Sequence, residues 1–393
     1  MSTMCYHPAE SLPLGDSVQE LPITMISSIC IQGYRGFNRF EMSELGRLNL
    51  LVGTNNSGKT SVLEALHLLT SRGDPMSLWQ LLWRRGERVS GSMNQRQPQA
   101  ELDVSHLFTG HETHVGSEFT LSAKNQTPER TVTFSIAELT KRDRQQLLDT
   151  EGGAIPSRLV LHIKGNPAPP VETIPLTRSG GILPDALDAP PRRRRHRRSE
   201  ENSSLFIATE SLDSDDLVSF WDKIALTSDE EIVLQALRLL HPGIERIAAQ
   251  AAMQYYGGHF RGGFIVKLKD HDQPIPIGSM GDGMWRMLSM AIAITQCKGG
   301  VFLVDEIDTG LHYTVMSDMW KLIFEASKAL DVQVFATTHS FDCIETLANI
   351  CVGGDLFSGN AVTLQRIETG RPKAVPYTEK EIRVASERGV EVR

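Results

Sequence analysis

The chain has 393 residues, a formal net charge of -8, 40% hydrophobic residues and 22% charged residues. These values describe a globular protein that can bury a sizeable core, and they exclude a fibrous or wholly disordered chain. The acidic balance also argues against a protein that coats nucleic acid over its whole surface. Five cysteines without C-x-x-C spacing disfavour a zinc site and a disulfide framework, and they favour reduced thiols in a cytoplasmic protein.

The N-terminus shows no signal peptide, because no apolar region follows a basic start. The most apolar stretch, residues 284–304, is interrupted by Arg286 and by Lys298, so no segment reaches membrane-spanning length. We therefore expect a cytoplasmic protein with no membrane partner. Residues 1–22 are punctuated by prolines and are predicted to form a disordered extension.

Ordered structure is predicted from Ile23 onward. Residues 23–42 alternate apolar and polar side chains and are rich in β-branched and aromatic residues, which indicates two antiparallel strands that turn around Gly33 to Gly36. The next apolar run, Leu48 to Val52, is predicted to be a buried strand. This strand leads directly into the first motif with chemical content.

Residues 53–60 read G-x-x-x-x-G-K-T between the predicted strand and an apolar helical pattern, which is the arrangement of a phosphate-binding loop. The glycines let successive backbone N–H groups turn toward a β-phosphate, and the helix N-terminus adds its positive dipole end. Lys59 is predicted to lie between the β- and γ-phosphates of ATP, and the Thr60 hydroxyl to ligate Mg²⁺. The alternative is a glycine turn between a core strand and a core helix. The predicted cofactor-binding residues of this loop are Gly53, Thr54, Asn55, Asn56, Ser57, Gly58, Lys59, Thr60 and Ser61.

An aromatic-Arg-Gly-Phe element, Tyr34 to Phe37, precedes this N-N-S-G-K-T loop. The pair of motifs resembles the head domain of SMC-like ABC ATPases, and within that group it most resembles the OLD (overcoming lysogenisation defect) family and its free-standing AAA/ABC ATPase relatives. The resemblance implies an α/β P-loop NTPase of ABC/SMC-head type, with a doubly wound core sheet, a flanking antiparallel β-sheet and an inserted helical lid. It also implies a Gln-bearing loop, for which Gln95, Gln97 and Gln99 are equal candidates.

The middle of the chain is predicted to be mostly β-structure. Residues 100–108 are predicted as a strand. Residues 116–178 alternate in short stretches that indicate antiparallel strands, with one helix near 142–148. Residues 23–166 therefore form the predicted first lobe of the ATPase, which includes the phosphate-binding loop.

Residues 167–204 form a predicted flexible insertion that is rich in proline and arginine. Six arginines and His196 occupy the seven positions from Arg192 to Arg198. Such a run is usually a disordered or solvated loop. The alternative is a sequence-independent, salt-sensitive contact to DNA phosphates, although no aromatic residues are interleaved for base stacking.

A helical pattern follows, and it predicts an inserted lid over residues 205–260. Apolar residues fall at helical spacing from Ser211 to Gln254, with a break at His241-Pro242-Gly243. Heptads do not persist, so the long coiled coil of true SMC proteins is absent. Residues 261–393 form the predicted second lobe, which carries the remaining active-site motifs.

A second anion-binding helix N-terminus is predicted in this lobe. Residues 262–268 read as a strand, and a serine with glycines then precedes an apolar helix predicted from Met284 to Cys297. The segment resembles the ABC signature L-S-G-G-Q, with departures at Met280 and Asp282. The resemblance implies contact with the γ-phosphate bound by the other subunit of a dimer, and the alternative is a capped helix start. The residues that this resemblance carries over are Ser279, Gly281 and Gly283.

The segment VFLVDE, residues 301–306, predicts a buried parallel strand that ends in two carboxylates at the carboxyl edge of the sheet, where such folds place ligands. Asp305 is predicted to hold Mg²⁺ through water, and Glu306 to orient and deprotonate the attacking water. Without the upstream loop, a carboxylate pair at a strand end can simply be solvated. The segment from Asp308 to His312 resembles the family's D-loop, and Asp308 is the residue that this resemblance carries over.

A histidine follows the next predicted strand. An amphipathic helix over residues 313–330 and a buried strand over residues 332–337 lead to His339. A histidine at this edge can donate to the γ-phosphate and stabilise charge in the transition state, which is the role of the family's switch histidine, whereas a lone histidine there is more often structural. The predicted catalytic residues are therefore Lys59, Glu306 and His339, with ATP and Mg²⁺ as cofactors.

Residues 361–367 and the chain end indicate a closing strand and a short helix, and 54 residues follow His339. OLD nucleases carry a Toprim domain after the ATPase, which needs roughly a hundred residues and does not fit here. The resemblance therefore implies an ATP-driven dimeric clamp or sensor, a homodimer or higher homo-oligomer, that regulates a separately encoded effector such as a Toprim-type nuclease in bacterial anti-phage defence. Two alternatives remain: a DNA repair or recombination clamp that binds DNA directly, and a transporter nucleotide-binding subunit.

Overall fold

The computed structural model describes residues 25–89, 101–124, 129–141, 143, 158–166, 171–187, 204–209, 211–250, 263–352 and 361–387. Four predictions fall outside this part of the chain. They concern the extension at residues 1–22, the glutamines at positions 95, 97 and 99, most of the helix at 142–148, and the arginine run at 192–198.

The six-stranded core sheet contains the strand that precedes the phosphate-binding loop. Five of its strands are parallel, and the edge strand β17 runs antiparallel to β16. Because neighbouring parallel strands end at the same edge, the segments that follow β3, β15 and β14 meet there. In spatial order the strands are β10 (Ser204–Ile207), β14 (Val301–Val304), β15 (Gln333–Thr337), β3 (Leu48–Val52), β16 (Val362–Arg366) and β17 (Val375–Thr378).

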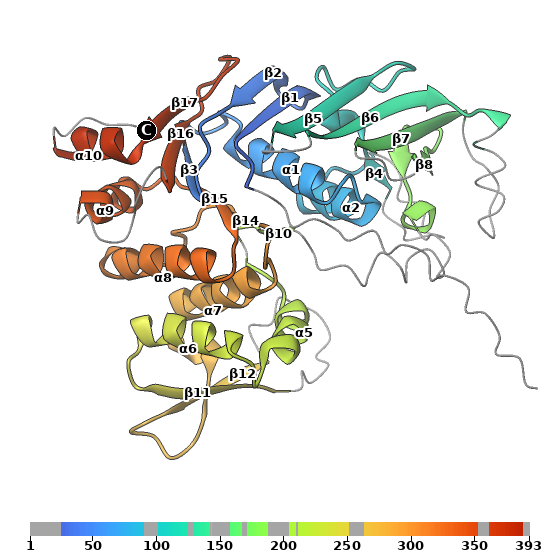
Figure 1. Cartoon of the computed structure of the whole chain (residues 1–393). Coiled ribbons are helices and arrows are strands. Elements are labelled where there is room, and N and C mark those ends of the chain that lie inside the picture. Colours follow the sequence, from blue (N-terminus) through green and yellow to red (C-terminus); the bar gives the residue numbers. More distant parts are fainter. Residues whose placement is uncertain are drawn as a thin grey trace, which may run out of the picture.

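Helices cover both faces of this sheet, so the predicted doubly wound arrangement is confirmed (Figure 1). Side chains of the central strands alternate between two buried clusters, as the period of a strand requires. Leu50 belongs to the cluster that includes α7 and α8, whereas Leu51 belongs to the cluster that includes α1. Among the described residues, no helix combines the length and the apolarity that crossing a bilayer requires. The helices are α1 (Lys59–Thr70) and α2 (Pro75–Arg84) on one face, and α7 (Asp282–Thr295), α8 (Met316–Ala329), α9 (Phe341–Val352) and α10 (Glu379–Glu387) on the other.

A second six-stranded sheet covers the far side of α1 (Figure 1). It is antiparallel throughout, as predicted for residues 116–178 and for the pair of strands around Gly33 to Gly36. Its inward side chains, such as Phe134 and Ile163, share a buried cluster with α1. In spatial order the strands are β2 (Phe37–Met42), β1 (Ser28–Tyr34), β5 (Glu118–Lys124), β6 (Arg130–Glu138), β7 (Leu159–Asn166) and β8 (Glu172–Pro175).

The range predicted as a helical lid contains two helices and also two strands that were not predicted. The helices α5 (Ser214–Ile224) and α6 (Asp229–Leu240) pack against α7 and share its buried cluster. One unpredicted strand, β10, is an edge strand of the core sheet, and its four residues beside a charged tract show no usable periodicity. The other, β11 (Ile244–Ala249), pairs with β12 (Phe264–Leu268), which in turn pairs with β13 (Ile275–Pro276).

One predicted strand is wrong, and several other elements of the described residues were not predicted. Residues 100–108 include only a two-residue strand, β4 (Leu102–Asp103), followed by a 3-10 turn (Ser105–Leu107). The Asp103 carboxylate accepts a hydrogen bond from the backbone N–H of Ser105 (2.8 Å), which turns the chain away from strand geometry. The short β4 pairs with β9 (Gly181–Ile182). The unpredicted elements include α2, α9, β9, β13 and β17.

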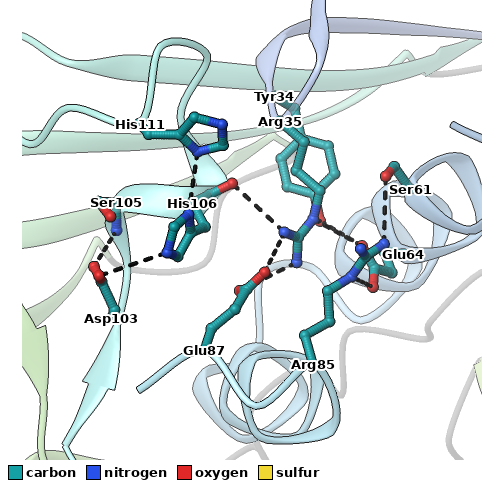
Figure 2. A network of polar contacts seen from close by, with 10 residues as sticks. All are labelled: Tyr34, Arg35, Ser61, Glu64, Arg85, Glu87, Asp103, Ser105, His106 and His111. Carbon is teal, nitrogen blue, oxygen red and sulfur yellow. Dashed lines mark hydrogen bonds and ion pairs between the residues drawn. The ribbon is translucent and has the colours of Figure 1, made fainter. Parts of the chain in front are cut away.

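A buried network of arginines and carboxylates fixes α1 against the turn of the first hairpin (Figure 2). Arg35 Nε lies 2.8 Å from Glu64 Oε2 on α1, and Arg35 Nη1 lies 2.6 Å from Glu87 Oε1. Arg85 Nε lies 2.6 Å from the other carboxylate oxygen of Glu64. Burial raises the pKa of the Tyr34 phenol, which therefore stays protonated and donates to Glu64. Two charges of each sign are thus paired around the helix that begins at the phosphate-binding loop.

We expect Arg35→Ala to lower the free energy of unfolding by about 3 kcal/mol, because it leaves carboxylate charge on Glu64 and Glu87 with less compensation in a buried setting. Urea unfolding followed by circular dichroism measures the change. Arg39→Ala is the control, since Arg39 is 63% exposed and its solvent-screened pair with Glu41 should contribute little to stability. Equal destabilisation by the two substitutions would show that the network does not hold α1.

Candidate functional site

The loop between β3 and α1 adopts a backbone conformation that requires its glycines. Gly53 has a φ of 143° and Gly58 a φ of 101°, and Asn56 between them is left-handed at 62°. A Cβ on Gly53 would overlap the carbonyl oxygen of Ile367, and a Cβ on Gly58 would overlap the ring of Phe37. Neither end of the loop accepts a side chain, which is the condition for backbone N–H groups to approach a phosphate closely.

Lys59 lies inside this loop at the first position of α1. It is 5% exposed, and its Nζ donates to the carbonyl oxygens of Gly53 (2.8 Å) and Thr54 (2.9 Å). Burial lowers the pKa of Lys59, and the carboxylates of Asp305 and Glu306 act in the opposite direction. The ammonium group is therefore close enough to both predicted carboxylates to interact with their charge. A phosphate bound in the loop would further favour its protonated form.

The two predicted magnesium ligands are hydrogen bonded to each other. Thr60 Oγ1 in the first turn of α1 donates to the Asp305 carboxylate, at 3.0 Å from Oδ2 and 3.3 Å from Oδ1. A hydroxyl and a carboxylate are oxygen ligands of the kind that Mg²⁺ prefers, so this pair fits the ion. No cluster of three or more metal-ligating side chains occurs within the described ranges, so phosphate oxygens and water would complete the shell of Mg²⁺.

Glu306 is held at the same edge in an unusual backbone conformation. Its φ is 47°, in the left-handed region that residues with a Cβ rarely adopt. Its N–H donates to Thr337 Oγ1 (2.8 Å), and that hydroxyl donates to Asp305 Oδ1 (2.6 Å). Thr309 Oγ1 donates to Glu306 Oε2 (3.2 Å). One threonine hydroxyl at the end of β15 therefore positions both carboxylate residues.

Thr338, which directly precedes the predicted switch histidine, contacts the predicted D-loop aspartate. Thr338 Oγ1 donates to Asp308 Oδ1 (2.6 Å) and accepts from the backbone N–H of Ser340 (2.9 Å). His339, which lies between Thr338 and Ser340 in the sequence, is exposed. The structure thus places His339 at the carboxyl end of β15, at the edge that also holds the two carboxylates.

The predicted signature residues lie at the start of α7. Ser279 is exposed in a short 3-10 helix (Ile277–Met280), Gly281 is the N-cap of α7, and Gly283 lies in its first turn. Gly281 and Gly283, not Ser279, therefore form the N-terminus of the helix itself. A Cβ on Gly283 would lie 2.8 Å from the carbonyl oxygen of Gly310, so the backbone of the D-loop segment packs directly on this first turn.

Sequence analysis did not assign Thr309, Thr337 or Thr338. Each of these threonines is close in sequence to a residue that was assigned, and each donates a hydrogen bond to a carboxylate of the site. Their hydroxyls beside strand-end carboxylates were the available signal. Phe37 was identified only through a resemblance. In the structure its ring lies against Gly58, so the first hairpin packs directly on the phosphate-binding loop.

Two protein-family models match the chain in succession. "AAA ATPase domain" matches residues 25–166, and "AAA domain, putative AbiEii toxin, Type IV TA system" matches residues 163–342. The chain is 22% identical over 342 residues to an "ATP/GTP phosphatase" from Helicobacter pylori. The matched region covers 83% of this chain and 88% of that protein. A shorter region of 44 residues is 48% identical to "DNA replication and repair protein RecF" of Pseudomonas savastanoi pv. phaseolicola. This region covers 11% of this chain and 12% of that protein.

Solved structures of SMC heads are similar at low sequence identity. The SMC head bound to the C-winged helix domain of ScpA has a TM-score of 0.44, and the SMC head domain from Thermotoga maritima has a TM-score of 0.42. Both are 14% identical to this chain, and each comparison covers 90% of this chain and 98% of the other.

The predicted fold class is confirmed by the strand order and by the family matches. The core is a parallel sheet with helices on both faces and a phosphate-binding loop after β3, and a second, antiparallel sheet flanks α1. The two matched models are both ATPase domains of the AAA type. The chain therefore has an α/β core with a P-loop and matches AAA-type domain models over residues 25–166 and 163–342.

We expect Thr337→Val to lower kcat for ATP hydrolysis by about tenfold or more with little change in ATP affinity, because valine keeps the shape but removes the hydrogen bonds that position Asp305 and Glu306. Steady-state phosphate release and titration with a fluorescent ATP analogue measure the two quantities. Thr363→Val is the matched control, since the hydroxyl of Thr363 is buried and donates to Asn49 (2.9 Å) within the core sheet. The same loss of kcat in both variants would assign the effect to core packing.

Proposed function

We propose that this chain is an ATP-hydrolysing, OLD-type clamp that closes as a dimer on two ATP molecules. The observation that carries the proposal is the convergence of Lys59, Thr60 and Asp305 at one edge of the core sheet, with Glu306 beside them. The family models matched by the chain support a nucleotide as the ligand. The relative named as an ATP/GTP phosphatase supports hydrolysis.

Within one site, the loop from Gly53 to Ser61 would hold the phosphates of ATP. Mg²⁺, when bound, neutralises charge on the β- and γ-phosphates, and Thr60 and Asp305 would hold it there, Asp305 through water. Glu306 would take a proton from the attacking water as its oxygen bonds to the γ-phosphorus and the bond to the β–γ bridging oxygen breaks. The exposed His339 would donate to the γ-phosphate and stabilise charge in the transition state. The products of this reaction are ADP and phosphate.

The dimer is proposed because the predicted signature segment is exposed. Gly281 is accessible at the N-terminus of α7, and Ser279 is accessible in the 3-10 helix just before it. A helix N-terminus can bind an anion, and in this scheme it has no role in the site of its own chain. In a head-to-tail dimer, this N-terminus would contact the γ-phosphate held by the partner. Asp308 lies in the segment packed against the same turn, so both segments would share the interface.

A separately encoded effector, such as a Toprim-type nuclease, is the proposed target of the clamp in bacterial anti-phage defence. The resemblance of Tyr34 to Phe37 and of the loop to OLD-type ATPases supports this role. The second matched model is described as "AAA domain, putative AbiEii toxin, Type IV TA system", and this description supports a role beside a second protein. In this scheme the nucleotide state of the clamp controls the effector, and hydrolysis resets it.

A DNA-binding clamp is the second candidate, and the short match to RecF favours it. In that case the protein itself would bind duplex DNA, and DNA would accelerate its ATP hydrolysis. A transporter subunit receives no comparable support, since the signature departs from L-S-G-G-Q at Met280 and Asp282.

Glu306→Gln is expected to lower turnover by about a hundredfold or more and to accumulate an ATP-bound dimer, because the proton acceptor is lost while the phosphate contacts remain. Size-exclusion chromatography with light scattering, run with ATP and Mg²⁺, measures the mass. Lys59→Ala is the control that should stay monomeric, since it lacks the phosphate-binding ammonium. A Glu306→Gln protein that remains monomeric with ATP at high concentration would contradict the clamp.

Addition of duplex DNA separates the effector-controlled clamp from the DNA-binding clamp. We expect DNA to change the ATPase rate of the isolated protein by less than about twofold and to bind with an affinity that deletion of residues 192–198 does not alter. Phosphate release and fluorescence anisotropy over a series of salt concentrations measure both quantities. Stimulation of about tenfold or more, or a salt slope that falls on deletion, would favour the DNA-binding clamp.

A further inference from the structure

Arg286 is a buried arginine on α7 whose guanidinium donates to oxygen atoms of two neighbouring segments. It is 2% exposed. Its Nη1 donates to the carbonyl oxygens of Ala208 (2.7 Å) and Thr209 (3.4 Å), and its Nη2 donates to those of Asp305 (2.8 Å) and Glu306 (3.1 Å). A planar fork that binds carbonyls of two segments holds those segments in a fixed relation to its own helix.

The carbonyl of Glu306 is a sensitive point for such a contact. Glu306 has the left-handed φ of 47°, a conformation that persists only where surrounding groups hold it. Thr337 on β15 holds its N–H, and Arg286 on α7 holds its C=O. The direction of the Glu306 side chain therefore depends on where α7 lies relative to β15.

The same helix begins at the segment that the proposed dimer turns toward the partner's nucleotide. Gly281 caps α7, and Gly283 is packed against the carbonyl oxygen of Gly310. Arg286 follows Gly283 by less than one helical turn, so a shift of the α7 N-terminus also moves the guanidinium. A γ-phosphate that docks on this N-terminus from the partner's site would thus change the position of Glu306 in the first chain's own site.

We infer that Arg286 is a positioning residue that couples the two ATP sites: α7 detects the γ-phosphate held by the partner, and Arg286 transmits its position to the backbone of Glu306 in its own chain. The inference rests on the proposed function. It predicts positive cooperativity, because a triphosphate bound in one site would shift the position of Glu306 in the other.

Mixed dimers with two different affinity tags test this coupling. In the first pair, one chain carries Arg286→Lys and the other carries Glu306→Gln, so all turnover comes from the Glu306 that lies in the same chain as the lysine. In the second pair, both substitutions are in one chain, so all turnover comes from the Glu306 of the unaltered chain. Lysine keeps the positive charge but lacks the planar fork that reaches two segments. The reference is a dimer of one unaltered chain and one Glu306→Gln chain.

We expect the first pair to hydrolyse ATP about ten to a hundred times more slowly than the reference, to lose cooperativity in its ATP dependence, and to bind the nucleotide with unchanged affinity. The second pair should match the reference. Equal loss in both pairs, loss only in the second pair, or no loss in either would overturn the inference. Failure of the reference dimer to form or to turn over would instead reject the proposed function before any Arg286 variant is measured.

Arg238→Lys is the matched control for loss of a structural arginine. Arg238 on α6 also donates to two main-chain carbonyls, those of Ile244 (3.0 Å) and Glu245 (3.2 Å). These contacts join α6 to β11 and do not involve the segment of Asp305 and Glu306. Both pairs made with Arg238→Lys should match the reference in rate and in cooperativity. A loss of cooperativity with Arg238→Lys would show that any weakened helix contact has this effect, and the inference would fail.

Discussion

The hydrogen bond from the Thr60 hydroxyl to the Asp305 carboxylate joins two positions that are 245 residues apart, and the proposed site depends on it. It forms because β3, β15 and β14 are parallel neighbours in register, with Leu51 opposite Thr337 and Ala336 opposite Val304. A register shift of one residue in β15 would turn the Thr337 hydroxyl to the opposite face of the sheet. The geometry of the carboxylates is therefore a property of the sheet as a whole.

The site is supported from both faces of that sheet. On one face, the first hairpin holds α1 through the paired charges of Arg35 and Glu64 (Figure 2). The ring of Phe37 also lies against Gly58 in the loop. On the other face, α7 reaches the carboxylate segment through Arg286. The proposed phosphate contacts and the proposed catalytic carboxylates thus lie on different supports. In the proposed mechanism, a movement of one face relative to the other would change catalysis without removing a phosphate ligand.

Local patterns allowed the principal elements of the site to be predicted. The apolar strand, the glycine loop and the helix that starts at Lys59 are contiguous, and the same is true of the strand that ends at Asp305. Patterns failed where the decisive contact is not local or the element is too short. The strand β10 has four residues and is defined by its pairing with β14, and the strand predicted over residues 100–108 is ended by the side chain of Asp103.

The sequence by itself determined which residues are the candidates for phosphate binding and for carboxylate chemistry, because each motif is built within a few consecutive residues around one strand end. Only the tertiary structure decided which side chains position them. Thr337 meets Asp305, and Arg286 meets the carbonyl of Glu306, because a sheet register and a helix packing bring separate segments within hydrogen-bond distance. A buried arginine or a threonine at a strand end has the same local sequence whether or not such a partner is present, so spacing along the chain could not reveal these contacts.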